Sequence, residues 1–128
     1  MKKIWILNHH SGLKGDRHYE LAKEMTSAGL EVVVFLSSFE HGKEKYRYEK
    51  EAVVQKIEDG LTYVWLHTSP AYHGNGAARI LNMMDYSRLM KKYEKNFYER
   101  FGRPDAVIGS SVHPFSWESA YGIARKCK

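Results

Sequence analysis

The residues of this chain that are suited to binding a ligand lie in two short loops and directly beside them. They are Gly12, Lys14, Gly15, Arg17, Ser110, Ser111 and His113. Glycine lets a backbone approach a ligand closely, while lysine, arginine, serine and histidine side chains donate hydrogen bonds to phosphate or other polar oxygen atoms. These residue types predict a binding site for a phosphorylated or otherwise polar small molecule.

Each of these positions also has a structural interpretation. Gly12 and Gly15 form a Gly-x-x-Gly pair, which occurs in many tight turns. Ser110 and Ser111 are suited to capping the helix that follows them as well as to binding a phosphate, and His113 can cap the same turn or bind a polar ligand group. The residue types leave both interpretations open, and they identify no catalytic residue.

Several motifs that would assign a specific chemistry are absent. The sequence contains no Gly-x-Gly-x-x-Gly, no Gly-x-x-x-x-Gly-Lys-Ser/Thr and no Gly-x-Ser-x-Gly. Classical nicotinamide binding, P-loop hydrolysis and a serine nucleophile elbow therefore lose support. His9 and His10 are adjacent, so on an extended segment they point to opposite faces, and Cys127 is the one cysteine. We expect no metal ion and no cofactor.

The first loop is positioned by a strand, a helix and a second strand. Residues 4–7 form a continuous apolar run, which suits a strand covered on both faces in a parallel sheet. Apolar residues then recur at helical spacing up to residue 28, with Asp16 as the predicted N-cap and Gly29 after the end. Residues 31–36 supply the second buried strand. The loop between Asn8 and Asp16 thus falls at the carboxyl end of a strand, where α/β sheets bind ligands.

The middle of the chain predicts a hairpin and a long helix. Residues 40–51 are strongly charged without an apolar period, which predicts an exposed loop. Asp59-Gly60 between two strand-like runs is the signature of a β-hairpin. A turn-rich segment at residues 69–76 precedes a helix expected over residues 77–101. The residues expected on the apolar face of that helix are Ile80, Met84, Met90, Tyr93 and Phe97.

The last part of the chain repeats the order of the first. Residues 105–109 predict a short buried strand, residues 110–115 a loop, and a helix begins near Ser116, with Pro114 suited to its first turn. The predicted fold is α/β, a Rossmann-like three-layer α/β/α arrangement with a mainly parallel sheet plus a β-hairpin. Both candidate loops then lie at strand carboxyl ends and are expected to line one crevice.

Length and composition favour a single domain. The chain has 128 residues and a net charge of +5, from 20 Lys and Arg against 15 Asp and Glu. No apolar run is long enough to span a bilayer, and the Met-Lys-Lys start leads directly into a strand, so we expect a cytoplasmic protein. The long helix carries a basic stripe at helical spacing, either a solvated face or a contact for anionic lipid headgroups or a phosphorylated substrate. The stripe is Arg88, Lys91, Lys92 and Lys95.

Five segments of the chain share their residue pattern with one known family. They are IWILNHHSG at 4–12, RHYELAKE at 17–24, VVVFLSSF at 32–39, GNGAARILNM at 74–83 and SSVHPF at 110–115. In this order the segments resemble the start of GT-B glycosyltransferases of family 4, and the fourth resembles the bacterial members that build cell-surface polysaccharide. The resemblance extends over essentially the whole chain.

The resemblance implies an N-terminal Rossmann-like domain that faces a C-terminal domain across a cleft. It implies transfer of a sugar from a nucleotide donor with retention of configuration and without a metal ion. The loop after the first strand approaches the donor diphosphate in such enzymes, which maps here onto Gly12 to Gly15. Most of the acceptor site belongs to the N-terminal domain, and the acceptor is often a lipid-linked sugar. The seven residues named at the outset are thus the expected donor-binding and substrate-binding positions.

Family members continue past the position of Lys128 through further strands and a second domain that grips the donor. We therefore expect residues 1–128 to be a partial, acceptor-side N-terminal domain that is inactive without a C-terminal domain and has one sheet edge left for association. The expected partners are a nucleotide sugar, a sugar or lipid-linked acceptor, the C-terminal domain and a peripheral membrane surface, with no nucleic acid. The alternative is a stand-alone small-molecule or phosphate-binding Rossmann-like module, and a third hypothesis is a charge-driven protein that binds nucleic acid or membranes.

Overall fold

A computed structural model describes residues 2–9, 16–110 and 114–127. The centre of the fold is a five-stranded sheet in the order β5-β6-β2-β1-β7. Four strands run parallel: β1 (Lys3–Leu7), β2 (Glu31–Ser37), β6 (Leu61–Leu66) and β7 (Ala106–Gly109). The fifth, β5 (Val53–Glu58), pairs antiparallel with β6. The predicted mainly parallel sheet with a hairpin is confirmed.

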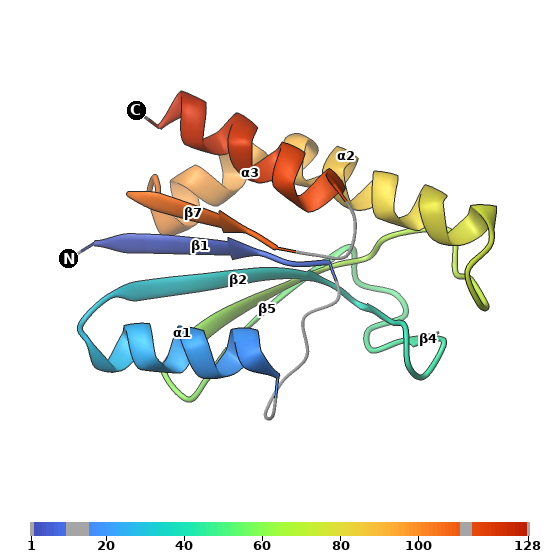
Figure 1. The fold of residues 1–128 in the computed structure, drawn as a ribbon, viewed down its shortest axis with the longest axis horizontal. Helices are drawn as coiled ribbons and strands as arrows, with labels where there is room; N and C mark the ends of the chain where they lie inside the picture. The colour runs from blue at the N-terminus through green and yellow to red at the C-terminus, as the bar shows by residue number, and fades with distance from the viewer. Residues whose placement is uncertain (1, 10–15, 111–113, 128) are drawn as a thin grey trace.

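Helices cover both faces of this sheet, so the predicted three layers are confirmed (Figure 1). Helix α1 (Arg17–Ser27) lies on one face, while α2 (Ala77–Phe101) and α3 (Pro114–Lys126) lie together on the other. Asp16 is the N-cap residue of α1, as predicted. Helix α3 begins at Pro114, slightly before the predicted start near Ser116, and Pro114 lies in its first turn as expected. The bounds of α2 agree with the prediction at both ends.

Each face of the sheet carries its own apolar core, because successive side chains of a strand point to opposite faces. The core under α2 and α3 is built on Trp5, Leu7, Val33 and Phe35 with Leu89, Met90, Phe97 and Ile123 from the helices. The core under α1 is built on Ile6, Val34, Leu61, Tyr63 and Trp65 with Tyr19 and Ala22. The two cores fix the sheet between its helices, so that the strand ends are held in a rigid frame.

The hairpin between β5 and β6 turns on Asp59 and Gly60, as predicted. Both residues have positive φ, 51° at Asp59 and 79° at Gly60. Two successive residues of positive φ are typical of a type I′ turn, whose twist matches that of the flanking strands. The turn brings β6 back beside β2, which completes the parallel part of the sheet.

The predicted apolar face of α2 is wrong at its N-terminal half. Ile80 and Met84 are 52% and 48% exposed, whereas Asn82 and Tyr86 are fully buried. The buried side of this half includes polar residues that hydrogen-bond inside the fold, so apolar spacing alone selected the wrong side of the helix. Leu21 of α1 is likewise 42% exposed although it matches the apolar spacing.

Two further expectations need correction, one about secondary structure and one about burial. The segment expected to be a charged surface loop contains a small antiparallel pair, β3 (Phe39–Glu40) with β4 (Lys45–Tyr46). Aromatic contacts explain the difference, since Tyr46 stacks on His67 with ring centroids 4.0 Å apart. The last strand was expected to be buried, but β7 is the edge of the sheet and its residues are at most partly buried.

Candidate functional site

The carboxyl ends of β1 and β7 lie side by side, as the two-loop hypothesis requires. The two strands are parallel neighbours with Leu7 opposite Gly109, and the Ser110 amide donates to the Leu7 carbonyl at 2.9 Å. Asn8 and Ser110, the first residues after the strands, therefore meet at one edge of the sheet. Arg17 is the first residue of α1 and is exposed. The other predicted site residues lie outside the described residues: Gly12, Lys14, Gly15, Ser111 and His113.

His18 joins these two strand ends, and sequence reasoning did not select it. It lies on the buried side of α1 with 9% of its surface exposed. Its Nδ1 is 2.9 Å from the Asn8 side-chain nitrogen, and its Nε2 is 2.7 Å from the Ser110 hydroxyl oxygen. We name Asn8, His18 and Ser110 the His18 network. The sequence did offer a signal for His18, because it lies on the same helix face as the apolar residues Tyr19 and Ala22. A polar side chain buried on such a face requires hydrogen-bond partners.

Asp16 contributes charge beside His18. Its side chain makes no hydrogen bond that caps α1, and one carboxylate oxygen lies 3.5 Å from His18 Nδ1. This distance is longer than that of an ordinary hydrogen bond to nitrogen. The carboxylate therefore acts on the ring mainly through its charge, and the Asn8 amide is the closer partner of the same nitrogen.

A second buried network connects the ends of β1, β2 and β6 to α2. The Asn82 side-chain oxygen accepts hydrogen bonds from His9 Nε2 at 2.7 Å and from the Thr68 hydroxyl at 2.8 Å. The Ser37 hydroxyl lies 2.6 Å from the Thr68 hydroxyl, and because Thr68 donates to Asn82, Ser37 donates to Thr68. The Asn82 amide nitrogen donates to the Pro70 carbonyl at 2.9 Å. We name His9, Ser37, Thr68 and Asn82 the Asn82 network.

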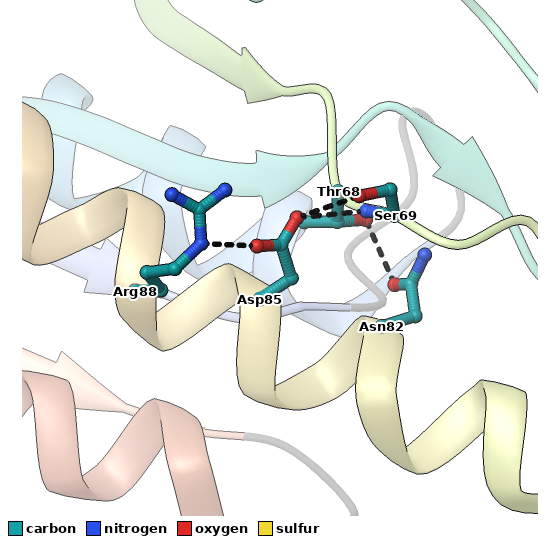
Figure 2. A network of polar contacts seen from close by, with 5 residues as sticks. All are labelled: Thr68, Ser69, Asn82, Asp85 and Arg88. Carbon is teal, nitrogen blue, oxygen red and sulfur yellow. Dashed lines mark hydrogen bonds and ion pairs between the residues drawn. The ribbon is translucent and has the colours of Figure 1, made fainter.

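The N-terminal half of α2 is also fixed to the segment after β6 at the protein surface. Figure 2 shows Asp85 between the two elements, with one carboxylate oxygen accepting from the Ser69 amide at 2.8 Å and from its hydroxyl at 3.2 Å. The other oxygen accepts from Arg88 Nε at 2.6 Å. One residue of the basic stripe is thus neutralised within the fold.

Tyr86 lies beneath His9 and is structural. The two rings meet edge to face with centroids 5.5 Å apart, and the Tyr86 hydroxyl donates to the Phe35 carbonyl at 2.7 Å. Burial raises the pKa of Tyr86 well above its usual value. The phenol therefore stays protonated and does not act as a base. Its role is to support His9 and the end of β2 through these two contacts.

An exposed clasp holds the β3–β4 pair against the segment that opens α2. Glu44 accepts hydrogen bonds from His73 Nδ1 at 2.6 Å and from the Gly74 amide at 3.1 Å. These two contacts lower the pKa of Glu44 from its ordinary 4.5, chiefly through His73 and then through the Gly74 amide. A carboxyl with a lowered pKa stabilises the fold above its unfolded pKa and loses that effect as the pH falls through the folded value.

Removing His73 is therefore expected to raise the pKa of Glu44. In the wild type, an NMR titration of the Glu44 side chain should give a midpoint below 4.5, and in His73→Ala the midpoint should move toward 4.5. Glu40, which has no contact with His73 among the described residues, serves as the internal control. Identical Glu44 midpoints in the two proteins would show that the clasp does not form in solution.

The described residues contain no group of three or more His, Cys, Asp or Glu side chains arranged to hold a metal ion. A pocket of about 30 Å³ lies between α2 and α3, lined by residues from Met90 to Glu94 and from Glu118 to Lys126. This volume accommodates about one water molecule, and the pocket shares no residue with the His18 or Asn82 networks. The polar strand ends therefore remain the better candidate site. The polar residues at these strand ends can donate hydrogen bonds to a ligand and orient it.

The fold resembles part of a known enzyme. A sucrose-phosphate synthase from Thermosynechococcus elongatus superimposes with a TM-score of 0.60 and 10% sequence identity, over 98% of this chain and 31% of that one. The chain thus spans about a third of the length of its structural neighbour. No protein-family model and no curated protein matches the sequence. At this level of identity the comparison shows the fold alone, an α/β fold like that of part of the sucrose-phosphate synthase.

Proposed function

We propose that the chain is the N-terminal, acceptor-side part of a retaining family 4 glycosyltransferase. The enzyme moves a sugar from a nucleotide-sugar donor to a sugar or lipid-linked acceptor in polysaccharide or glycolipid synthesis. The fold match to part of a sucrose-phosphate synthase supports the architecture. The order of the five family-like segments supports the family. Sugar transfer by the whole enzyme requires a C-terminal domain that binds the nucleotide-sugar donor.

One observation carries this proposal beyond the fold. The strands of the first and last βα units end side by side, and His18 joins their ends by accepting a hydrogen bond from the Asn8 amide and by a second hydrogen bond to Ser110. Ligands of open α/β sheets bind outside such strand ends. In this proposal the donor diphosphate lies against the loops that begin at Asn8 and at Ser110.

The proposed donor-binding residues are those that the sequence selects. Backbone N–H groups near Gly12 and Gly15 stabilise the leaving phosphate as charge develops, since preorganised donors act strongly where water is excluded. Lys14 and Arg17 supply positive charge, and Ser110, Ser111 and His113 supply hydrogen bonds. No metal ion takes part.

A transfer assay tests the proposal. The chain is produced together with a C-terminal donor domain, encoded downstream of Lys128 in its source or supplied as a separate polypeptide. It is then incubated with radiolabelled uridine and guanosine diphosphate sugars and lipid-linked acceptors. We expect labelled product with one donor and none from either polypeptide alone. Absence of transfer with every donor, from a mixture shown to assemble, would contradict the proposal.

The second candidate function is a self-sufficient phosphate-binding or small-molecule module. It is favoured by the His18 network, which is complete within this chain. Calorimetric titration of the isolated chain with nucleotides separates the two functions. The glycosyltransferase proposal expects weak or undetectable heat, because half of the donor site is contributed by another domain. Micromolar binding by the isolated chain would favour the module.

We further propose that α2 places the protein on the cytoplasmic face of an anionic membrane. Ile80, Leu81 and Met84 are 52%, 53% and 48% exposed at its N-terminal end. The exposed basic stripe follows on the same side at helical spacing, and no ion pair among the described residues involves Lys92 or Lys95. Apolar residues that enter the headgroup region beside lysines that meet anionic lipid are typical of interfacial helices. Within the described residues, no helix combines the length and apolar character of a membrane span.

Replacing Lys91, Lys92 and Lys95 by glutamine is expected to weaken vesicle binding by about 100-fold, since each basic residue contributes roughly 1 kcal/mol near an anionic surface. Cosedimentation with phosphatidylserine vesicles at low and physiological salt measures the effect. The control replaces Lys43, Lys45 and Lys50, which are also exposed but lie in or near β4. Equal losses in the two variants, or equal binding to zwitterionic vesicles, would rule out this surface.

A further inference from the structure

The hydrogen bonds around His18 determine which ring nitrogen carries its proton. The Asn8 side-chain nitrogen, which lies 2.9 Å from Nδ1, is a donor, so Nδ1 must accept. The proton of a neutral imidazole is then on Nε2, which faces the Ser110 hydroxyl oxygen at 2.7 Å. His18 therefore donates to Ser110.

Asp16 favours the opposite arrangement, because a carboxylate attracts a proton to the nitrogen that it faces. Its oxygen is 3.5 Å from His18 Nδ1, whereas the Asn8 amide nitrogen is 2.9 Å away. A hydrogen bond weakens steeply with length, and 3.5 Å is at its outer limit. The shorter contact to Asn8 decides the tautomer.

The direction of this hydrogen bond sets what Ser110 can do. Because its oxygen accepts from His18, its own proton points away from the ring, and no described residue accepts that proton. A serine that is to act as a nucleophile must instead donate to its histidine. The geometry thus removes Ser110 as a nucleophile and leaves it as a donor toward the strand ends, where it is partly buried.

We propose that His18 is a positioning residue, held in one tautomer by Asn8, that aims the Ser110 hydroxyl at a phosphate oxygen of the bound nucleotide. The inference deepens the proposed function and rests on it for the identity of the ligand. The ligand chemistry is that of a diphosphate, an acceptor of hydrogen bonds at every oxygen. Arg17 is exposed at the start of the helix that carries His18 and adds positive charge there.

The tautomer is measurable without any ligand. A long-range proton–nitrogen NMR spectrum of the histidine-labelled chain at neutral pH distinguishes a protonated from an unprotonated ring nitrogen. We expect His18 to carry its proton on Nε2, and Asn8→Asp, which replaces the amide donor by an acceptor, to shift the proton toward Nδ1. A wild-type ring protonated on Nδ1 would overturn the inference.

Binding is tested by NMR titration of the labelled chain with uridine and guanosine diphosphates, the nucleosides and inorganic pyrophosphate. We expect the diphosphates to shift the Ser110 amide and the nucleosides to leave it unchanged. A response to pyrophosphate equal to that of the nucleotides would assign the site to the phosphates alone. Ser110→Ala should weaken diphosphate binding about 10- to 100-fold, the loss typical of a hydrogen bond to a charged group.

Two substitutions at His18 separate positioning from structure. A glutamine amide places an acceptor and a donor about as far apart as the two ring nitrogens, so His18→Gln should retain most of the binding. His18→Phe preserves the ring shape without its hydrogen bonds and should lose as much as Ser110→Ala, with no further loss in the double variant. Binding by folded His18→Phe at the wild-type level, or loss in His18→Gln equal to that in His18→Phe, would overturn the inference.

These outcomes are distinct from failure of the proposed function. If no sugar is transferred by the assembled protein while Ser110 still responds to diphosphates, the inference stands and the transferase proposal fails. If transfer occurs and Ser110→Ala leaves both the turnover and the donor affinity unchanged, the proposed function stands and the inference fails. Absence of a Ser110 response in the isolated chain and in the assembled protein also overturns the inference.

Discussion

Replacing Asn82 by alanine is expected to lower the free energy of unfolding by about 3 to 5 kcal/mol, because each buried donor or acceptor left without a partner costs roughly 1 to 3 kcal/mol. Asn82 is fully buried, and its side-chain oxygen is the shared acceptor of His9 and Thr68. The substitution also removes the donor to the Pro70 carbonyl. Chemical denaturation monitored by circular dichroism measures the change.

The matched control is Asn96→Ala on the same helix. Asn96 is exposed, and its side chain makes no hydrogen bond among the described residues, so its replacement should change stability by less than about 0.5 kcal/mol. Asn82→Leu distinguishes lost hydrogen bonds from lost volume, since it fills the space without supplying an acceptor and should remain strongly destabilising. Equal stabilities of the Asn82 and Asn96 variants would show that the Asn82 network does not hold the strand ends together.

Replacing Gly109 by alanine is expected to destabilise the fold by about 1 to 3 kcal/mol, the usual cost of forcing an extra carbon into a packed interior. An added Cβ would lie 2.7 Å from Ala120 Cβ, 3.0 Å from Trp117 Cα and 3.1 Å from the Ser116 carbonyl oxygen. These atoms belong to the backbone of α3 or lie directly on it, so the helix itself must move away from β7. Ser110 is the next residue, and the displacement should also weaken ligand binding.

Gly122→Ala in α3 is the matched control and is expected to stabilise the fold. An added Cβ at this position meets nothing within 4 Å, and alanine favours a helix over glycine by about 0.5 to 1 kcal/mol. Thermal unfolding of the two variants should therefore shift in opposite directions from the wild type. A stabilising Gly109→Ala would mean that α3 does not pack against β7 as closely as the structure describes.

The fold was predictable where one local pattern determines one element. A two-residue hairpin turn needs two successive residues of positive φ, and Asp59-Gly60 is a pair that adopts this conformation readily. Gly102 likewise ends α2 with a φ of 78°. The long apolar runs of β1 and β2 indicated strands covered on both faces, and both faces are covered by helices. In each case the signal lies within a few consecutive residues.

The errors arise where distant residues decide. Ile80 and Met84 have the spacing of a core face, but the sheet selects the side of α2 that carries Asn82, because His9 and Thr68 offer it hydrogen bonds from 73 and 14 residues away. The β3–β4 pair forms although its sequence is charged, because aromatic rings such as Tyr46 find partners elsewhere in the chain. Periodicity within one segment does not report either contact.

The candidate site shows the same division. Ser110 was selected from its place after a strand, and the structure brings it beside the end of β1 as expected. His18 was missed because its role depends on Asn8 and Ser110, which lie 10 and 92 residues away in the sequence. Hydrogen bonds between residues so distant in the sequence can be predicted only once the order of the strands in the sheet is known.

The central claim is that the edge formed by the ends of β1 and β7 binds the nucleotide donor. An amide NMR map of the labelled chain during titration with uridine and guanosine diphosphates to millimolar concentration tests it most directly, because weak binding is still located residue by residue. We predict shifts concentrated at Asn8, His18 and Ser110, with none at Lys91, Glu118 or Lys126 around the pocket between α2 and α3. Shifts confined to that pocket, or no shift at the strand ends with either nucleotide, would contradict the account.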